Sequence, residues 1–183
     1  MNLQLKKKIV LDVSFEDLYR DNFNFVWRSL RGLGVNPALL DDATQEVFMV
    51  VNRRLSEYEP TGSVKNWLYA ILRRVAKDAR RKEKRKGGAL LLDETQYTDG
   101  QNPHRSAESN EALRIVENFA DSLDDERRSI FVLSEIEQMR VPEISDILNI
   151  NVNTIYSRLK VIREDFQKVV DKTFKGYKGT GHV

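Results

Sequence analysis

The sequence predicts an all-α protein with two small helical domains, residues 11–86 and 110–175, joined by a flexible linker at residues 87–109. Three observations predict this class. Apolar residues recur at helical spacing in both outer parts of the chain. No stretch alternates apolar and polar residues as a half-buried strand does. Between the two parts lies GGALLLDETQYTDGQNPHRSAES, an acidic segment whose three glycines, proline and small polar residues are typical of a linker.

Start signals divide the first domain into three helices. Ser14 is a suitable N-cap for the first helix, because its hydroxyl can accept a hydrogen bond from an unpaired backbone N–H. Asn36 followed by Pro37 predicts the start of the second helix, since proline is favoured at the first helical position. Ser63 predicts the start of the third helix, which continues into a basic segment.

The second of these helices has an acidic and amide-bearing face opposite its apolar side. Asp42, Gln45, Met49 and Arg53 fall on this face, with acidic neighbours beside them. Carboxylates suit nucleic acid poorly, and an exposed methionine adapts to varied surfaces, so this face suits a protein partner. A solvated charged face is the alternative interpretation.

The third helix ends in RRVAKDARRKEKRK, residues 73–86, with nine Lys or Arg against two acidic residues. In a chain of net charge +2, such a block indicates a polyanionic partner, although a solvated helix end is the alternative. Opposite the apolar side, Asn66, Arg73, Lys77 and Arg80 form a stripe. Such cations neutralise the backbone of single-stranded DNA, and an aromatic side chain beside them gives a base a surface on which to stack. This stripe therefore suits single-stranded DNA.

The second domain is predicted to hold four helices, of which the last two form a helix-turn-helix in ISDILNINVNTIYSRLKVIRED. Pro142 opens the first helix of the pair. Asn149 suits the left-handed residue that ends it, and Asn151 is a good N-cap for the next.

The last helix divides cleanly into two faces when laid out at 3.6 residues per turn. The inner stripe holds Val152, Ile155, Leu159 and Ile162. The outer side holds Asn153, Ser157 and Lys160, flanked by Tyr156 and Arg158. Amides, hydroxyls and cations near a helix N-terminus suit the reading of base edges in a major groove. An ordinary helical hairpin with a hydrated polar face is the alternative.

Composition excludes several classes of function. Cysteine is absent and the two histidines, His104 and His182, lie in polar stretches, so we expect no disulfide, zinc site or histidine-based triad. We expect no catalytic residue, metal or cofactor. No apolar run reaches about 18 residues and no signal peptide is evident, so we expect a protein of the reducing cytoplasm without membrane insertion.

Together these motifs resemble an extracytoplasmic-function (ECF, group IV) sigma factor, a small two-domain class of bacterial transcription initiation factor. FEDLYRDNFNFVWRSLRGLG and DDATQEVFMVVNRRLSEYEPTGSVKNWLYAILRRVAKDARRKEKR are similar to sigma region 2. LDDERRSIFVLSEIEQMRVPEISDILNINVNTIYSRLKVIREDF is similar to sigma region 4, and the linker takes the place of region 3. The chain departs from the family pattern at Ala43 and Thr44, and at Tyr156, where the family often has a basic residue.

The resemblance implies a role for each surface and names three partners: core RNA polymerase, promoter DNA and an anti-sigma factor. The implied polymerase-binding residues are Asp41, Asp42, Gln45, Glu46, Met49 and Arg53. The residues expected to bind the opened −10 element are Tyr58, Lys65, Asn66, Tyr69, Arg73, Arg74, Lys77 and Arg80. Those expected to read the −35 element are Asn153, Thr154, Tyr156, Ser157, Arg158, Lys160 and Arg163.

Two other functions compete with this interpretation. A stand-alone helix-turn-helix regulator would bind its operator without polymerase. A metal-dependent nuclease would use the paired acids Asp41/Asp42 or Asp124/Asp125. Adjacent side chains on a helix diverge by about 100°, so these pairs make poor metal clamps without further ligands.

Overall fold

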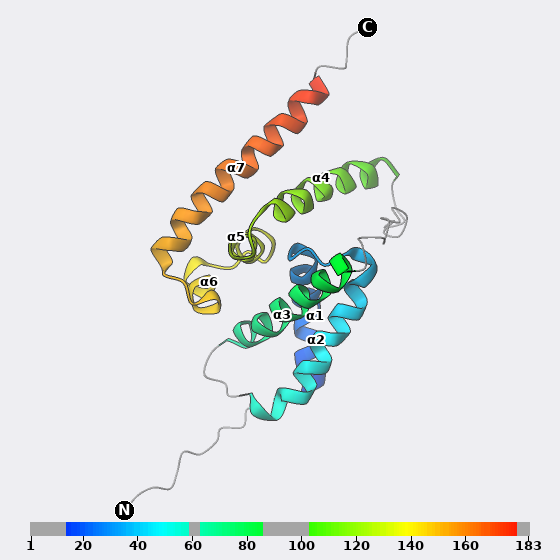
Figure 1. The fold of residues 1–183 in the computed structure, drawn as a ribbon, viewed down its shortest axis with the longest axis vertical. Coiled ribbons are helices and arrows are strands. Elements are labelled where there is room, and N and C mark those ends of the chain that lie inside the picture. Colours follow the sequence, from blue (N-terminus) through cyan, green and yellow to red (C-terminus); the bar gives the residue numbers. More distant parts are fainter. Residues whose placement is uncertain (1–13, 59–62, 86–102, 179–183) are drawn as a thin grey trace, which may run out of the picture.

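A computed structural model describes residues 14–58, 63–85 and 103–178, and over these residues the chain contains helices and no strand. The α-helices are α1 (Phe15–Gly32), α2 (Leu40–Arg54), α3 (Val64–Arg85), α4 (Pro103–Ser122), α5 (Asp125–Phe131), α6 (Val141–Leu148) and α7 (Val152–Lys178) (Figure 1). Short 3₁₀ turns flank α2 at Pro37–Leu39 and Leu55–Glu57. A π-helical turn at Val132–Ile136, called here the π-turn, follows α5. The predicted all-α class is confirmed.

The predicted start signals act as caps. The Ser14 hydroxyl accepts a hydrogen bond from the backbone N–H of Asp17 at 3.1 Å, and Ser63 accepts from the N–H of Lys65 at 3.2 Å. The Asn36 side chain accepts from the N–H of Ala38, but it caps the first 3₁₀ turn rather than the α-helix. The second helix therefore begins at Leu40, three residues after Pro37, because a 3₁₀ turn forms its entry.

Helix α4 begins at Pro103, within the segment predicted to be a linker and upstream of the predicted start near residue 109. A proline fits the first turn of a helix, where its missing N–H leaves no hydrogen bond unmade. The rest of the predicted linker, residues 87–102, lies outside the described residues.

The first domain is a bundle of α1, α2 and α3 around a buried apolar core. Each of the three helices contacts the other two. The core side chains that are fully buried are Val26, Leu30, Leu40, Val47, Val51, Leu68 and Leu72. They belong to the apolar residues that recur at helical spacing in this part of the sequence, which is why these segments form helices that pack together.

The second domain packs α4, α5, α6 and α7 around a smaller core. Phe119 of α4, Phe131 of α5 and Phe166 of α7 form an aromatic cluster with ring centroids 5.0 to 5.8 Å apart. This cluster fixes the long helix α7 to α4 and α5.

The helix-turn-helix has the predicted turn. Asn149 adopts the left-handed conformation, with φ of 54° and ψ of 46°, and ends α6. The Asn151 side chain accepts a hydrogen bond from the N–H of Asn153 at 2.9 Å and so caps α7. The Ser145 hydroxyl donates to the carbonyl of Ile150 at 2.6 Å, which closes the turn from the α6 side.

The two domains contact one another. Helix α1 packs against the π-turn, and α3 packs against α6 (Figure 1). None of the helices formed by the described residues is long and apolar enough to cross a membrane.

Candidate nucleic-acid and protein interfaces

The N-terminal half of α7 places a polar face over a buried stripe. The buried inner residues are Ile155, Leu159 and Ile162. The exposed outer residues are Asn153, Tyr156, Ser157 and Lys160. The predicted division of this helix into an inner and an outer face is therefore confirmed.

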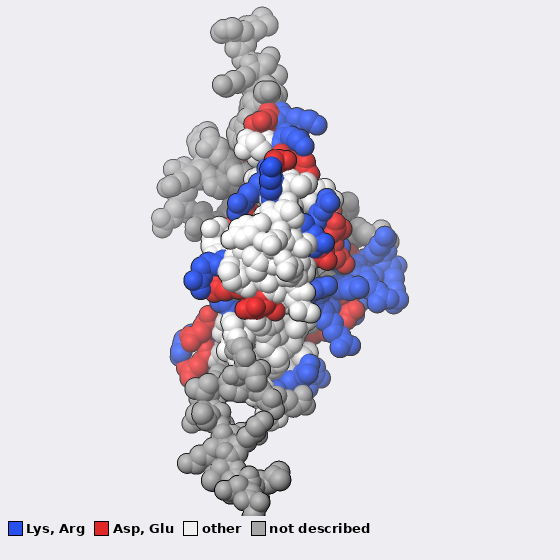
Figure 2. All heavy atoms as spheres, turned by 90° about the vertical axis from the view of Figure 1, so that its left-hand side faces the viewer, with Lys and Arg blue, Asp and Glu red and all other residues white. Residues whose placement is uncertain are grey.

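Figure 2 shows the side of the molecule on which α6 and the start of α7 lie. Uncharged side chains cover the middle of this face, and Lys and Arg side chains lie along its edges together with Asp and Glu side chains. A helix that enters a major groove needs amides and hydroxyls at the base edges and cations at the rim, near the phosphates. The Lys and Arg side chains at the edges of this face meet the second part of that requirement.

Two of the arginines predicted to contact DNA are engaged by acidic side chains of the same domain. Arg158 forms an ion pair with Glu126 of α5. The Arg163 guanidinium lies 2.9 Å from a carboxylate oxygen of Glu135, in the π-turn. Each cation is therefore partly neutralised by a neighbouring carboxylate in this structure. The remaining predicted residue, Thr154, is half-buried, and its carbonyl accepts a hydrogen bond from the Ser157 hydroxyl at 2.9 Å.

Helix α3 has one edge open to solvent. Of the residues predicted to bind the −10 element, the exposed cations are Arg73, Arg74 and Lys77. Asn66 is half-buried near the start of the helix. The Tyr58 ring lies 4.8 Å from the Trp67 ring, and both side chains are half-buried. The structure thus brings aromatic rings to the same end of the helix as Asn66. Residues 59–62 of the predicted strand-opening loop lie outside the described residues.

The second domain covers the other edge of α3. Tyr69 is 1% exposed, and this burial raises the pKa of its hydroxyl. The Arg80 guanidinium lies 3.1 Å from a carboxylate oxygen of Asp125, on α5. Lys65 is half-buried. The pKa of Glu143, on α6, is lowered chiefly by the hydrogen bond from the Arg140 backbone N–H, and the charge of Lys65 is the smallest of the causes that lower it. Two residues predicted to bind the −10 element, Tyr69 and Arg80, therefore lie at a contact between the domains.

The acidic and amide face of α2 is open. All six of its predicted residues are exposed: Asp41, Asp42, Gln45, Glu46, Met49 and Arg53. Thr44, on the inner side, is 3% exposed, and its hydroxyl has no hydrogen-bond partner among the described residues.

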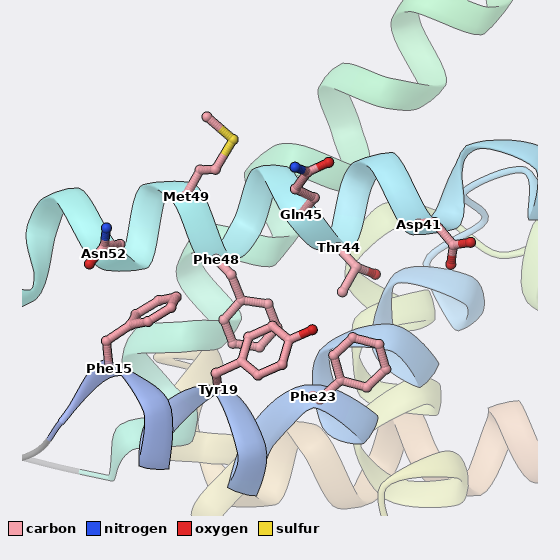
Figure 3. Close-up of a pocket in the computed structure, with 9 residues that line it drawn as sticks. All are labelled: Phe15, Tyr19, Phe23, Asp41, Thr44, Gln45, Phe48, Met49 and Asn52. Atoms are coloured by element: carbon pink, nitrogen blue, oxygen red, sulfur yellow. The ribbon is translucent and has the colours of Figure 1, made fainter.

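A groove of about 500 Å³ runs between α1 and α2 beside this face (Figure 3). Its floor is aromatic, with Phe15, Tyr19 and Phe23 of α1 against Phe48 of α2. The Tyr19 and Phe48 ring centroids are 4.6 Å apart. Met49 of α2 points away from the rings and is 55% exposed.

Sequence reasoning did not find this groove. The signal was present, because the three aromatic residues of α1 stand four positions apart and so share one helix face.

The paired acids considered for a metal site have structural roles in the second domain. The Asp124 carboxylate caps α5, accepting from the N–H groups of Glu126 and Arg127 at 3.1 and 2.9 Å. Asp125 pairs with Arg80. No cluster of three or more potential metal ligands occurs in the part of the chain that the structure describes. This arrangement gives no support to the nuclease hypothesis.

Comparison with known proteins matches each domain to a family. Residues 18–86 match the model of sigma-70 region 2, and residues 113–165 match sigma-70 region 4. The ECF RNA polymerase sigma factor SigE of Mycolicibacterium smegmatis is 28% identical over 161 residues, which are 87% of this chain and 62% of that relative. The ECF sigma factor SigW of Bacillus subtilis is 27% identical, over 83% of this chain and 84% of its own. The match thus spans less than two thirds of the length of SigE of Mycolicibacterium smegmatis.

A solved structure has a similar fold. It is the sigma factor RpoE of Bartonella quintana in complex with the anti-sigma factor NepR, with a TM-score of 0.62 and 17% identity. The similarity covers 86% of this chain and 96% of that one.

Proposed function

Because the chain belongs to the extracytoplasmic-function (ECF) RNA polymerase sigma factors, we propose that it binds core RNA polymerase and directs it to particular promoters. It is a specificity subunit rather than an enzyme, since the polymerase carries out RNA synthesis. The observation that carries the proposal is the exposed amide, hydroxyl and lysine face of α7, held over a buried stripe in a helix-turn-helix.

In this proposal α7 reads the −35 element in the major groove. Asn153 and Ser157 offer hydrogen bonds to base edges, and Lys160 neutralises a phosphate at the rim. Tyr156, which is 57% exposed, supplies an aromatic edge next to them. Arg158 and Arg163 contribute less to phosphate binding, because each keeps its ion pair with Glu126 or Glu135.

Helix α3 then holds the non-template strand of the opened −10 element. Its exposed cations Arg73, Arg74 and Lys77 follow the backbone. Tyr58 and Trp67 at its start place aromatic surface where a base that leaves the duplex can stack.

The exposed face of α2 binds the clamp of core polymerase, with Asp41, Asp42, Gln45 and Glu46 as its polar contacts. The aromatic groove beside it offers a site for an apolar side chain of the partner. Polar contacts alone would leave the interface without such a buried apolar centre. A stand-alone helix-turn-helix regulator is not favoured, because it gives no role to the region 2 match or to this face.

We also propose that an anti-sigma factor binds this chain, because the sigma factor RpoE of Bartonella quintana, which has a similar fold, is in complex with the anti-sigma factor NepR. The cytoplasm, where core polymerase is found, is its proposed location.

In vitro transcription tests the proposed function. Core polymerase is incubated with a library of genomic promoters, with and without this chain, and the RNA 5′ ends are mapped. The proposal predicts start sites that appear only when the chain is present and that share an upstream and a −10 sequence. If the chain adds no start site, the proposal is wrong. If it binds an upstream sequence tightly without polymerase, the stand-alone regulator is favoured.

A further inference from the structure

The aromatic groove between α1 and α2 exposes apolar surface. Tyr19 is 42% exposed and Met49 is 55% exposed, and Phe15 and Phe23 beside them are half-buried. The second domain contacts α1 through the π-turn and α3 through α6, and these side chains still remain accessible. Exposed apolar side chains that gather in a groove mark a place where another segment binds.

Both walls of the groove repeat every four residues. The repeating residues are Phe15, Tyr19 and Phe23 on α1, and Asp41, Gln45 and Met49 on α2. Phe15 and Asn52 share one end of the groove, and Phe23 and Asp41 share the other (Figure 3). Four residues of an α-helix advance about 6 Å, and two residues of an extended chain advance about 6.6 Å. Alternate side chains of an extended segment would therefore match both walls.

The sequence before α1 has such an alternation. Residues 1–13, MNLQLKKKIVLDV, lie outside the described residues. Lys7, Ile9 and Leu11 stand two positions apart, so they share one face when the segment is extended. Val10 falls on the opposite face. One face therefore offers two large apolar side chains followed by a cation.

The start of α1 places this segment at the Phe15 end of the groove. Ser14 caps α1, and Val13 precedes the cap. An apolar residue at that position often packs against the fourth helical residue, here Leu18, and so sets the angle at which the chain enters the helix. If the chain turns back there, an extended segment from Ser14 to Lys7 reaches about 23 Å.

That reach matches the length of the groove. From Asn52 to Asp41, α2 advances about 16 Å. Leu11 would lie beside Met49 and Lys7 beside Asp41, since alternate residues keep pace with the helical repeat.

Charge favours the same register. Three consecutive lysines, residues 6–8, precede Ile9. Asp41 and Asp42 are exposed at the far end of the groove, and neither forms an ion pair within the described part of the chain. Lysines placed against these carboxylates would fix the register of the segment, as complementary charges do at interfaces.

We propose that residues 7–13 of this chain dock in the aromatic groove and compete with core polymerase for α2. Ile9 and Leu11 cover the rings, and Lys7 pairs with Asp41. This inference rests on the proposed function, which assigns the face of α2 to polymerase, and it adds a regulation to that function.

The docked fraction sets the size of the effect. When only the undocked form binds polymerase, the apparent Kd equals the intrinsic Kd divided by the undocked fraction. An undocked fraction of about one tenth would weaken polymerase binding by about tenfold, and a variant that cannot dock would regain that factor.

Crosslinking within the free chain tests the docking. The chain contains no cysteine, so Lys8→Cys with Asp42→Cys gives a single reactive pair and keeps Lys7, Ile9 and Leu11. A short bifunctional thiol reagent is added at low protein concentration, and the rate of crosslinking within one chain is measured. Adding Ile9→Ser and Leu11→Ser should slow that rate several-fold. Adding Val10→Ser, on the opposite face, is the matched control and should leave the rate unchanged.

Affinity for core polymerase tests the competition. The same serine substitutions are made in the chain without cysteines, and binding to immobilised core polymerase is measured by biolayer interferometry. We expect the Ile9→Ser and Leu11→Ser double variant to bind about tenfold more tightly than the original chain. The Val10→Ser control should bind as the original does.

The inference is overturned if the double variant crosslinks as fast as the original, or if it binds polymerase no more tightly than the Val10→Ser control. Crosslinks that join two chains would also overturn it, because a second copy would then occupy the groove. Failure of the proposed function has a different signature: no chain binds core polymerase, whatever its crosslinking rate. The competition would then be overturned with that function, while the crosslinking rate alone decides the docking.

Discussion

Replacing Lys160 with alanine tests how α7 holds the DNA backbone. Lys160 is exposed beside the base-reading residues, whereas Arg163 is already paired with Glu135. Each phosphate contact releases condensed counterions, so it contributes about −0.9 to the slope of log affinity against log salt concentration. We therefore expect Lys160→Ala to make that slope shallower by about 0.9.

The change in slope corresponds to a measurable difference in affinity. Raising salt from roughly 50 to 200 mM changes its concentration fourfold, over which one contact is worth about 3.5-fold in affinity. At low salt the variant binds DNA more weakly than the original chain does. When salt is raised over this range, both affinities fall, and the factor by which the variant's affinity falls should be about 3.5 times smaller than the factor for the original chain.

Fluorescence anisotropy provides the assay, with holoenzyme assembled from core polymerase and a promoter duplex that carries only the upstream element. Ser157→Ala is the neutral control: it should weaken binding and leave the slope unchanged, because no charge is removed. Arg163→Ala should change the slope less than Lys160→Ala, since its cation is compensated before DNA binds. An unchanged slope for Lys160→Ala, or an equal change for both cations, would refute the reasoning.

Three further predictions concern the other surfaces and the fold. Asp42→Arg or Gln45→Arg should abolish co-purification with core polymerase while the helical circular dichroism stays the same; unchanged co-purification would show that α2 does not bind the clamp. Lys77→Ala should weaken binding to a forked −10 template more than to intact duplex, with Lys172→Ala as an exposed control on α7; equal losses on both templates would contradict the single-strand assignment. Ile155→Ala should lower the free energy of unfolding by about 2–5 kcal/mol in urea titrations, because the side chain is fully buried beneath the outer face of α7, and a loss below about 1 kcal/mol would count against that packing.

Local features of this fold could be predicted because their physical causes lie within a few residues. Ser14, Ser63 and Asn151 cap helices through hydrogen bonds to N–H groups two or three positions ahead. Asn149 ends α6 in the left-handed conformation that asparagine tolerates. The inner stripe of α7 was also predictable, since helical spacing alone identifies it.

Contacts between distant parts of the chain could not be predicted in the same way. Tyr69 lies off the apolar stripe of α3, so its sequence position indicates an exposed residue, yet the second domain buries it. The pairing of Arg28 with Glu137 joins positions 109 residues apart. Gly32 reads as a helix end, and only the packed structure explains why no side chain fits there. The candidate −10 site on α3 therefore stays a prediction, and two of its residues, Tyr69 and Arg80, are covered or paired in a way that the sequence did not indicate.

Photo-crosslinking in the open promoter complex tests most directly whether the two domains contact different promoter elements. A photoreactive residue is placed at position 157 on α7 or at position 77 on α3, holoenzyme is bound to a promoter, and the crosslinked nucleotides are mapped. The account predicts crosslinks from position 157 to the −35 element and from position 77 to the non-template strand of the −10 element. Crosslinks from both positions to the same element, or from position 77 to duplex DNA alone, would contradict it.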